Sequence, residues 1–220
     1  MINKIVQSMA DAMAGIKDGS TVLIGGFGAV GQPDQLIEGL IEQGATDLTC
    51  VANNAGTGRV GLARLMELGR VRKIICSFPR SAGSVVFEEL YRQGKIELEI
   101  VPQGTMAERM RAAGAGVPAF FTATSVGTIL ANGKEQREFN GRTYVLETAI
   151  QVDYAFIRAH RADRAGNVQF RGGSQNLSPA FAKAARITVV EVDEIVEVGE
   201  LPPESVTLPG IFVARVFKSE

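Results

Sequence analysis

The sequence predicts an α/β fold with a largely parallel, open sheet that carries helices on both faces, together with β-hairpin elaborations in the C-terminal half. Between residues 21 and 101, apolar segments of strand length alternate with segments of helical periodicity, and this alternation is typical of parallel sheets with crossover helices. Beyond Phe121 the alternation gives way to two predicted hairpins. No linker or low-complexity stretch interrupts the sequence, so we expect residues 1–220 to form a single domain.

The first three elements follow from local signals. Apolar residues recur at helical spacing over residues 4–16, which predicts a helix, and residues 21–24 form an apolar strand. A helix over residues 33–42 is expected next. The carboxylate of Asp34 favours the positive end of its dipole, and Gly44 suits the position that closes its other end.

The same order of strand and helix continues along the chain. Strands are expected over residues 48–52, 72–77 and 97–101, and helices over residues 60–68 and 84–91. Ligands of open parallel sheets bind where strands give way to helices. The four loops that follow the predicted strands are the turn 25–31, Asn53-Asn54, Phe78-Pro79-Arg80 and Gln103-Gly104. We therefore expect these loops to converge on one rim of the sheet.

The C-terminal half carries the hairpin signals. Asn140-Gly141 predicts a hairpin between residues 136–139 and 142–146, because both residues tolerate the positive φ of a type I′ turn. A second ribbon is expected to pair residues 154–159 with 168–170 as an elaboration of the same domain. A helix over residues 178–185 and a strand over residues 187–192 follow.

The turn after the first strand is rich in glycine. It consists of Gly25, Gly26, Phe27, Gly28, Ala29, Val30 and Gly31. Glycine adopts positive φ without steric cost, so this backbone can approach a ligand closely. The run also has the spacing of a nicotinamide dinucleotide fingerprint. However, Pro33 places the helix start after the last glycine, and the second strand ends in Asn53-Asn54 without the carboxylate that would bind a ribose, so this interpretation is the weaker one.

Several stretches, in the same order along nearly the whole chain, resemble the family I coenzyme A transferases. They are Asp18-Gly19 with the glycine-rich turn and Pro33, Asn53-Asn54-Ala55-Gly56, Cys76-Ser77-Phe78-Pro79-Arg80, Pro102-Gln103-Gly104-Thr105, the run 114–121 and Pro209-Gly210-Ile211-Phe212-Val213. The chain is similar to the A (alpha) subunits of that family. Around Phe78 it is most similar to the 3-oxoadipate branch.

The resemblance implies a function. The chain would be the non-nucleophile A subunit of a heteromeric enzyme that moves coenzyme A from an acyl-CoA such as succinyl-CoA to a 3-oxoacid, with 3-oxoadipate as the first candidate and acetoacetate or a short-chain fatty acid as alternatives. It also implies a covalent glutamyl-CoA route, whose glutamate lies in a Glu-Asn-Gly-type motif on the B subunit. No glutamate of this chain is followed by Asn-Gly. We therefore expect activity only in a hetero-oligomer with the B subunit, such as A2B2, with coenzyme A as a cosubstrate and no tightly bound cofactor.

The resemblance further implies roles for individual residues. Gln103 would stabilise an oxyanion or position a carboxylate, Asn53 and Asn54 would contact the acid substrate, and the turn Gly25 to Gly31 would contact coenzyme A. Amides suit such a site because they donate hydrogen bonds without the tight ion pair that would trap substrate. Arg80 could bind the distal carboxylate of a dicarboxylic acid, although a surface ion pair is the interpretation we favour. An ordinary turn at Asn53-Asn54 also remains open.

Composition excludes several function classes. A formal net charge of −1, from 23 basic and 24 acidic residues, provides no field for nucleic acid or an anionic membrane. No apolar run approaches the ~18 residues of a membrane span, and the first residues lack a signal-peptide pattern, so we expect a cytoplasmic protein. Cys50 and Cys76 suit reduced core thiols. The lone His160 has no cluster of metal ligands around it in the sequence.

Two further points stay open at this stage. Similar sheets recur in proteins of other function, so a non-catalytic module that binds an acyl-CoA or a sugar phosphate is an alternative. The segment Arg171-Gly172-Gly173-Ser174-Gln175-Asn176 departs from the family pattern that we expect, whereas its flanks keep to it. Specificity for the acid could therefore lie in this segment.

Overall fold

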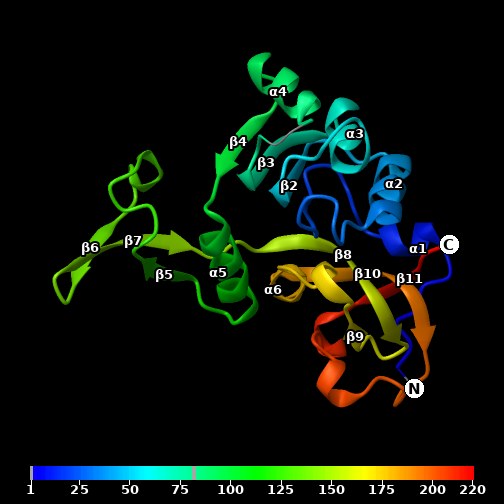
Figure 1. Ribbon diagram of the computed structural model, residues 1–220. Coiled ribbons are helices and arrows are strands. Elements are labelled where there is room, and N and C mark those ends of the chain that lie inside the picture. Colours follow the sequence, from blue (N-terminus) through cyan, green and yellow to red (C-terminus); the bar gives the residue numbers. More distant parts are fainter. Residues whose placement is uncertain (1, 81–82) are drawn as a thin grey trace.

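The structure is a computed structural model that describes residues 2–80 and 83–220. Its main feature is an eight-stranded sheet with the order β11-β10-β8-β1-β2-β3-β4, in which β9 pairs with β8 (Figure 1). The strands of this sheet are β1 (Thr21–Ile24), β2 (Leu48–Asn54), β3 (Val71–Phe78), β4 (Glu97–Ile100), β8 (Val152–Asp163), β9 (Val168–Gln169), β10 (Ala185–Val196) and β11 (Arg215–Lys218). A second, three-stranded sheet has the order β5-β7-β6 and consists of β5 (Ala119–Thr122), β6 (Gln136–Phe139) and β7 (Arg142–Thr148).

Helices cover both faces of the main sheet. They are α1 (Met9–Met13), α2 (Asp34–Gln43), α3 (Gly61–Glu67), α4 (Val85–Arg92), α5 (Gln103–Gly114) and α6 (Ser178–Lys183). Val22 and Ile24 of β1 lie in one apolar cluster with α1 to α4, whereas Leu23 lies in another with Met106 of α5 and Phe181 of α6. Successive side chains of a strand point to opposite faces. Because the strands from β11 to β4 also pair in parallel, the predicted α/β fold class is confirmed.

The helix predicted over residues 4–16 is wrong in its first half. Only Met9–Met13 is helical. The residues before it run alongside β11, where the Val6 N–H donates to the Val216 carbonyl at 2.9 Å and the Val216 N–H donates to the Lys4 carbonyl at 2.8 Å. An edge strand offers unpaired backbone groups, so these long-range hydrogen bonds outweigh the local helical periodicity.

The second predicted ribbon also needs correction. Residues 152–163 form one strand of 12 residues, β8, which lies between β10 and β1 and runs parallel to both. The antiparallel partner β9 is short and pairs only with Arg161 and Ala162. Most side chains of β8 are buried, as is typical of a parallel strand covered on both faces. The segment is therefore part of the central sheet and not an elaboration.

The first predicted hairpin is confirmed. Phe139 of β6 (Gln136–Phe139) pairs with Arg142 of β7 (Arg142–Thr148). Between them Asn140 has φ 50° and Gly141 has φ 73°, which is the left-handed geometry that a type I′ turn requires. Here the local turn signal alone was sufficient.

The amino-terminal end of α2 lies against a buried carboxylate from β10. Glu191 is only 1% exposed, and its Oε2 atom accepts the backbone N–H groups of Gln35 at 3.0 Å and Leu36 at 3.1 Å. The first N–H groups of a helix have no partner within the helix, so this side chain satisfies two of them. Burial raises the pKa of Glu191 above its ordinary value, although the Leu36 N–H and the nearby Arg158 oppose this shift.

Three further observations concern the helices and the titratable side chains of the described residues. Within residues 2–80 and 83–220, no helix is both long enough and apolar enough to cross a membrane, and no three His, Cys, Asp or Glu side chains gather as metal ligands. His160 instead lies beside Asp193, with 3.3 Å between Nδ1 and Oδ2. Burial raises the pKa of the Cys50 and Cys76 thiols to about 12, so both are neutral near pH 7.

Candidate functional site

A pocket of about 490 Å³ lies where β1, β2 and β3 end and α5 begins. We call it the rim pocket, and it is lined by Phe27, Gly28, Asn53, Asn54, Thr57, Ser77, Phe78 and Gln103. Each of the four loops predicted to form a ligand-binding rim contributes at least one of these residues. The parallel sheet brings them together because it places the carboxyl ends of neighbouring strands side by side.

Asn53 lies at the centre of a hydrogen-bond cluster. It is 5% exposed, and its Oδ1 atom accepts the Gln103 Nε2–H at 2.6 Å. The Ser77 hydroxyl lies 3.1 Å from the same Oδ1 and 3.0 Å from the Asn53 carbonyl oxygen. Because both neighbours use the oxygen of Asn53, its NH2 group and the second N–H of Gln103 remain as donors toward a ligand.

Asn54 has a different role in the same loop. Its Oδ1 atom accepts the backbone N–H of Gly56 at 3.0 Å, which is the hydrogen bond of an Asx turn. The turn-forming interpretation therefore describes Asn54, whereas the side chain of Asn53 reaches across to α5.

The glycine-rich turn divides into a packed part and an open part. Phe27 and Val30 exchange backbone hydrogen bonds of 3.0 and 3.1 Å, and both side chains are about half exposed. Gly28, at the tip of this turn, has φ +62°, and a Cβ atom there would meet no other atom within 4 Å. By contrast, a Cβ at Gly26 would lie 3.2 Å from the backbone of Gln32. Phe27 and Gly28 line the rim pocket.

The other glycines of the turn serve close packing. A Cβ atom at Gly25 would lie 3.1 Å from the Phe156 carbonyl oxygen of β8, and one at Gly31 would lie 2.9 Å from the Ser174 carbonyl oxygen. Asn176 also donates its Nδ2–H to the Val30 carbonyl at 3.3 Å. The segment 171–176 thus packs against the glycine-rich turn, whereas Ala29 projects from it in an exposed position.

Arg80 lies near the rim but does not line the pocket. Its Nε–H donates to Oε1 of Glu88 at 2.9 Å, and its side chain is 75% exposed. Glu88 also binds Arg92 through its other oxygen at 3.0 Å. The surface ion pair that we favoured for Arg80 from the sequence is therefore present, and the guanidinium group of Arg80 is accessible to solvent.

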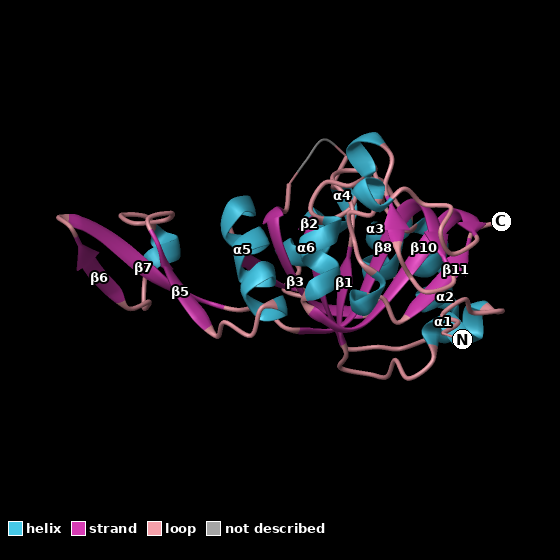
Figure 2. Cartoon of the chain, turned by 90° about the horizontal axis from the view of Figure 1, so that it is seen from below, coloured by secondary structure: helices cyan, strands magenta, loops and turns pink. Residues whose placement is uncertain are grey.

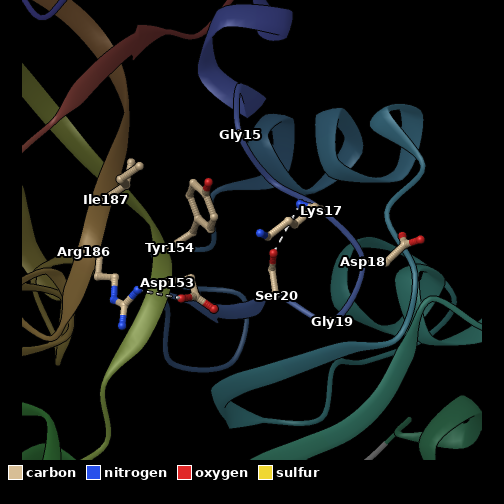
Figure 3. A pocket seen from close by; sticks show the side chains of 9 residues that line it. All are labelled: Gly15, Lys17, Asp18, Gly19, Ser20, Asp153, Tyr154, Arg186 and Ile187. Carbon is tan, nitrogen blue, oxygen red and sulfur yellow. Dashed lines mark hydrogen bonds and ion pairs between the residues drawn. The ribbon is translucent and has the colours of Figure 1, made fainter.

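A second pocket, of about 350 Å³, lies at the other ends of the strands, where β1, β8 and β10 begin (Figure 3). Asp153 accepts the Thr21 N–H at 2.9 Å and lies 4.0 Å from the Arg186 guanidinium. Lys17 and Asp18 line it as well, so its charges are balanced. None of the predicted site residues lies there, and we assign the candidate site to the rim pocket.

Sequence reasoning missed Thr57 and Ser77 as pocket residues. Ala52 pairs with Cys76 and Asn54 pairs with Phe78, so the parallel register places Ser77 directly beside Asn53. A serine near the end of an otherwise apolar strand is a weak signal by itself. It becomes informative only when the neighbouring strand is known.

Comparison with known proteins establishes the family. A family model described as coenzyme A transferase matches residues 6–219. The chain belongs to the coenzyme A transferase family. It is 56% identical over 216 residues to the A subunit of a 3-oxoadipate CoA-transferase from Pseudomonas putida, covering 98% of this chain and 94% of the relative. It is 46% identical over 219 residues to the A subunit of a succinyl-CoA:3-ketoacid coenzyme A transferase from Helicobacter pylori, covering 100% of this chain and 94% of the relative.

The fold agrees with that of a solved coenzyme A transferase. The crystal structure of glutaconate coenzyme A-transferase from Acidaminococcus fermentans superposes with a TM-score of 0.87, covering 98% of this chain and 75% of that chain, at 24% sequence identity. At this level of identity the comparison concerns the fold alone. It supports the arrangement of the parallel sheet that forms the rim pocket.

Proposed function

We propose that this chain is the A subunit of a two-subunit coenzyme A transferase, and that its rim pocket holds the carboxylate and thioester groups while a partner B subunit supplies the nucleophilic glutamate. The main support for this proposal is the chemistry of the residues that line the rim pocket. The lining residues of the rim pocket, all within the described part of the chain, are amides, hydroxyl groups, aromatic rings and glycine, without an ionisable side chain. A carboxylate nucleophile must then come from outside the pocket.

The hydrogen-bond cluster around Asn53 offers N–H donors of the kind that acyl transfer requires, because negative charge develops during the reaction. Attack on a thioester carbonyl places negative charge on its oxygen, and preorganised N–H donors stabilise that charge. Gln103 presents an N–H group held in place by Asn53 at 2.6 Å. Neutral donors bind the product carboxylate weakly enough to release it. We therefore assign oxyanion stabilisation or carboxylate positioning to Gln103, and carboxylate contact to Asn53 and the NH2 group of Asn54.

The open part of the glycine-rich turn is the proposed coenzyme A contact. Phe27 offers an exposed ring, and Gly28 leaves the backbone bare at the tip of the turn. A thioester arm can lie against such a surface without steric conflict. Gly25, Gly26 and Gly31 would support this contact indirectly, because they allow the turn to pack closely on its neighbours.

We propose succinyl-CoA as a donor and 3-oxoadipate as the first acceptor, with acetoacetate or a short-chain fatty acid as the alternatives. The 3-oxoadipate assignment is supported by the 56% identical relative of that name. Arg80 is the candidate for the distal carboxylate. Its exposed ion pair with Glu88 contributes less than about 1 kcal/mol, and Glu88 keeps Arg92 as a partner when Arg80 turns to the substrate. The A2B2 stoichiometry and the cytoplasmic location stay predictions.

Trapping of the covalent intermediate tests the division of roles between the two chains. They are mixed with acyl-CoA and treated with borohydride, which reduces a glutamyl thioester, and each chain is then analysed by mass spectrometry. We expect the modification only on the B subunit, and no transferase activity from this chain by itself. A reduced glutamate on this chain, or turnover without the B subunit, would contradict the proposal.

Substitution of Ser77 tests the role of the hydrogen-bond cluster around Asn53. We expect Ser77→Ala to lower kcat/KM of the assembled enzyme on the order of 10-fold, because loss of one hydrogen bond of about 1.4 kcal/mol leaves Asn53 and Gln103 less well positioned. Ser77→Thr keeps the hydroxyl and should recover most of the activity. Ser205→Ala is the control, because its hydroxyl bonds a backbone carbonyl at 2.8 Å outside the rim pocket. Equal activity of the Ser77→Ala and Ser205→Ala enzymes would exclude a positioning role.

A further inference from the structure

The rim pocket has a polar part and an apolar part. The polar part is the hydrogen-bond cluster around Asn53, a side chain that is only 5% exposed. The apolar part consists of the rings of Phe27 and Phe78, which are 52% and 58% exposed. The Asn53 side chain therefore lies at the floor of the pocket, and the two rings lie at its mouth. Such a combination of apolar walls and a few polar groups is typical of sites for small organic molecules.

The strand order places the two rings on opposite sides of Asn53. Phe27 follows β1 and Phe78 ends β3, whereas Asn53 belongs to β2, which lies between these strands. Neighbouring strands are about 4.8 Å apart, so β1 and β3 are separated by roughly 10 Å. Within residues 2–80 and 83–220, neither ring contacts another aromatic ring. The pocket therefore has two separate apolar walls.

The wall formed by Phe78 continues around the end of β3. Ser77 and Phe78 are adjacent in this strand and point to opposite faces of the sheet. Ser77 bonds Asn53 on the face that α5 covers, whereas Phe78 lies on the same face as Cys76, which packs in the apolar cluster with α4. Figure 1 shows α4 and α5 on opposite sides of β3, and Figure 2 shows the face that α5 covers. Because both Ser77 and Phe78 line the rim pocket, the pocket reaches over the end of β3 from one face to the other.

Beyond the Phe78 ring this path leads toward Arg80. Arg80 lies two residues further along the chain and pairs with Glu88 of α4, so it is on the α4 side of the sheet. An acid whose reacting carboxylate is held in the Asn53 cluster would extend its carbon chain along the Phe78 ring. A second carboxylate at the far end of that chain would then approach Arg80.

We propose that Phe78 is a specificity-determining residue, because its ring forms the wall along which the carbon chain of the acid substrate lies. The inference rests on the proposed function, which assigns the reacting carboxylate to Asn53 and Gln103 and the coenzyme A arm to Phe27. The acids that fit are unbranched and carry several carbon atoms behind the reacting carboxylate, with or without a second carboxylate. Phe78 contacts this chain and takes no part in the covalent step.

Inhibition by simple acids of increasing length tests this inference. Propionate, butyrate and pentanoate differ by single methylene groups, and each is measured as a competitor of the acceptor acid in the assembled enzyme. The acceptor is 3-oxoadipate, or acetoacetate if 3-oxoadipate is not turned over. We expect the inhibition constant of the wild-type enzyme to fall about 4-fold per added methylene group, which corresponds to about 0.8 kcal/mol. For Phe78→Ala we expect this dependence on length to disappear.

Two further variants make the result specific for Phe78. Phe27→Ala removes the other ring, and we expect it to raise the KM of succinyl-CoA while the dependence on acid length stays as in wild type. Leu68→Ala is the control, because Leu68 is a half-exposed apolar residue at the end of α3, outside the rim pocket. A Phe78→Ala enzyme that keeps the wild-type dependence would overturn the inference, as would loss of the dependence in the Phe27→Ala enzyme alone.

Fluorescence provides a second readout that requires no turnover. This chain contains no tryptophan, so Phe78→Trp places its single indole at the position of the ring, and Leu68→Trp is the matched control. Each variant is assembled with the same B subunit and titrated with pentanoate. We expect the emission of the Phe78→Trp complex to shift to shorter wavelength, because the apolar chain replaces water beside the indole. Absence of a shift, or an equal shift in the control, would overturn the inference. Lack of transferase activity in the wild-type complex would instead refute the proposed function.

Discussion

Gln103→Ala in the assembled enzyme is expected to lower kcat on the order of 100-fold, which is the usual loss for one oxyanion donor. The structure supports such an effect because Gln103 is the first residue of α5 and its amide is held by Asn53 at the wall of the rim pocket. The measurement is steady-state turnover with an acyl-CoA and the acceptor acid, at saturating concentrations of both.

The distribution of the loss between kcat and KM separates the two roles considered for Gln103. A fall in kcat with little change in KM indicates oxyanion stabilisation, whereas a rise in the KM of the acid indicates carboxylate positioning. Gln93→Ala is the matched control, because Gln93 is an exposed amide at the end of α4. Turnover equal to that of the control enzyme would remove Gln103 from the site.

Glu191→Ala is expected to lower the free energy of unfolding by about 3 kcal/mol, because it leaves two backbone N–H groups of α2 without an acceptor in a buried place. The groups are those of Gln35 and Leu36, and both bond the same Oε2 atom. The measurement is urea unfolding of the chain at a fixed protein concentration. Glu38→Ala is the control, since this half-exposed carboxylate on the same helix forms an ion pair with Arg64. A loss no larger than that of the control would contradict the capping role.

The pH dependence of the Glu191→Gln variant gives a second test. Burial raises the pKa of Glu191 in the folded chain above its ordinary value of 4.5. The folded state therefore binds this proton more tightly than the unfolded state, and the resulting stabilisation is complete below pH 4.5 and is lost as the pH rises through the folded pKa. Glutamine keeps an acceptor oxygen and does not titrate. We expect the variant to gain stability relative to wild type as the pH rises above 4.5, and a difference that does not change with pH would contradict the shift.

Local signals predicted the elements that depend on neighbouring residues. The strand 21–24 has the predicted bounds, and the hairpin at Asn140-Gly141 forms as expected. In both cases an apolar pattern or a turn preference acts over a few residues. The segment 4–16 and the strand β8 were predicted wrongly because their partners, β11 and β10, lie far along the chain. Pairing with a distant strand replaced the structure that the local pattern favoured.

The candidate site was likewise predictable in part from the sequence and in part only from the structure. Motif spacing and strand order placed Asn53, Phe78 and Gln103 on one rim, and the structure brings these three residues to one pocket. The sequence did not reveal that Asn53 bonds Gln103 while Asn54 closes a turn. Adjacent residues of a strand point to opposite faces of the sheet. The side chains of Asn53 and Asn54 therefore lie in different surroundings, although they are chemically identical. The catalytic and binding roles of these residues, and the single domain over residues 1–220, stay predictions.

The order of distinctive motifs was enough to identify the family by resemblance, and periodicity was enough to predict the parallel α/β sheet and the group of loops that meet at its rim. Folding in three dimensions was needed to establish that Ser77 supports Asn53, that Arg80 pairs with Glu88 at the surface, and that Glu191 satisfies the start of α2. It also established that Val145 and Glu147 are buried on one face of the sheet β5-β7-β6. The reason is physical: each of these outcomes depends on which side chains the fold brings within hydrogen-bond or packing distance, and neither periodicity nor spacing along the chain contains that information.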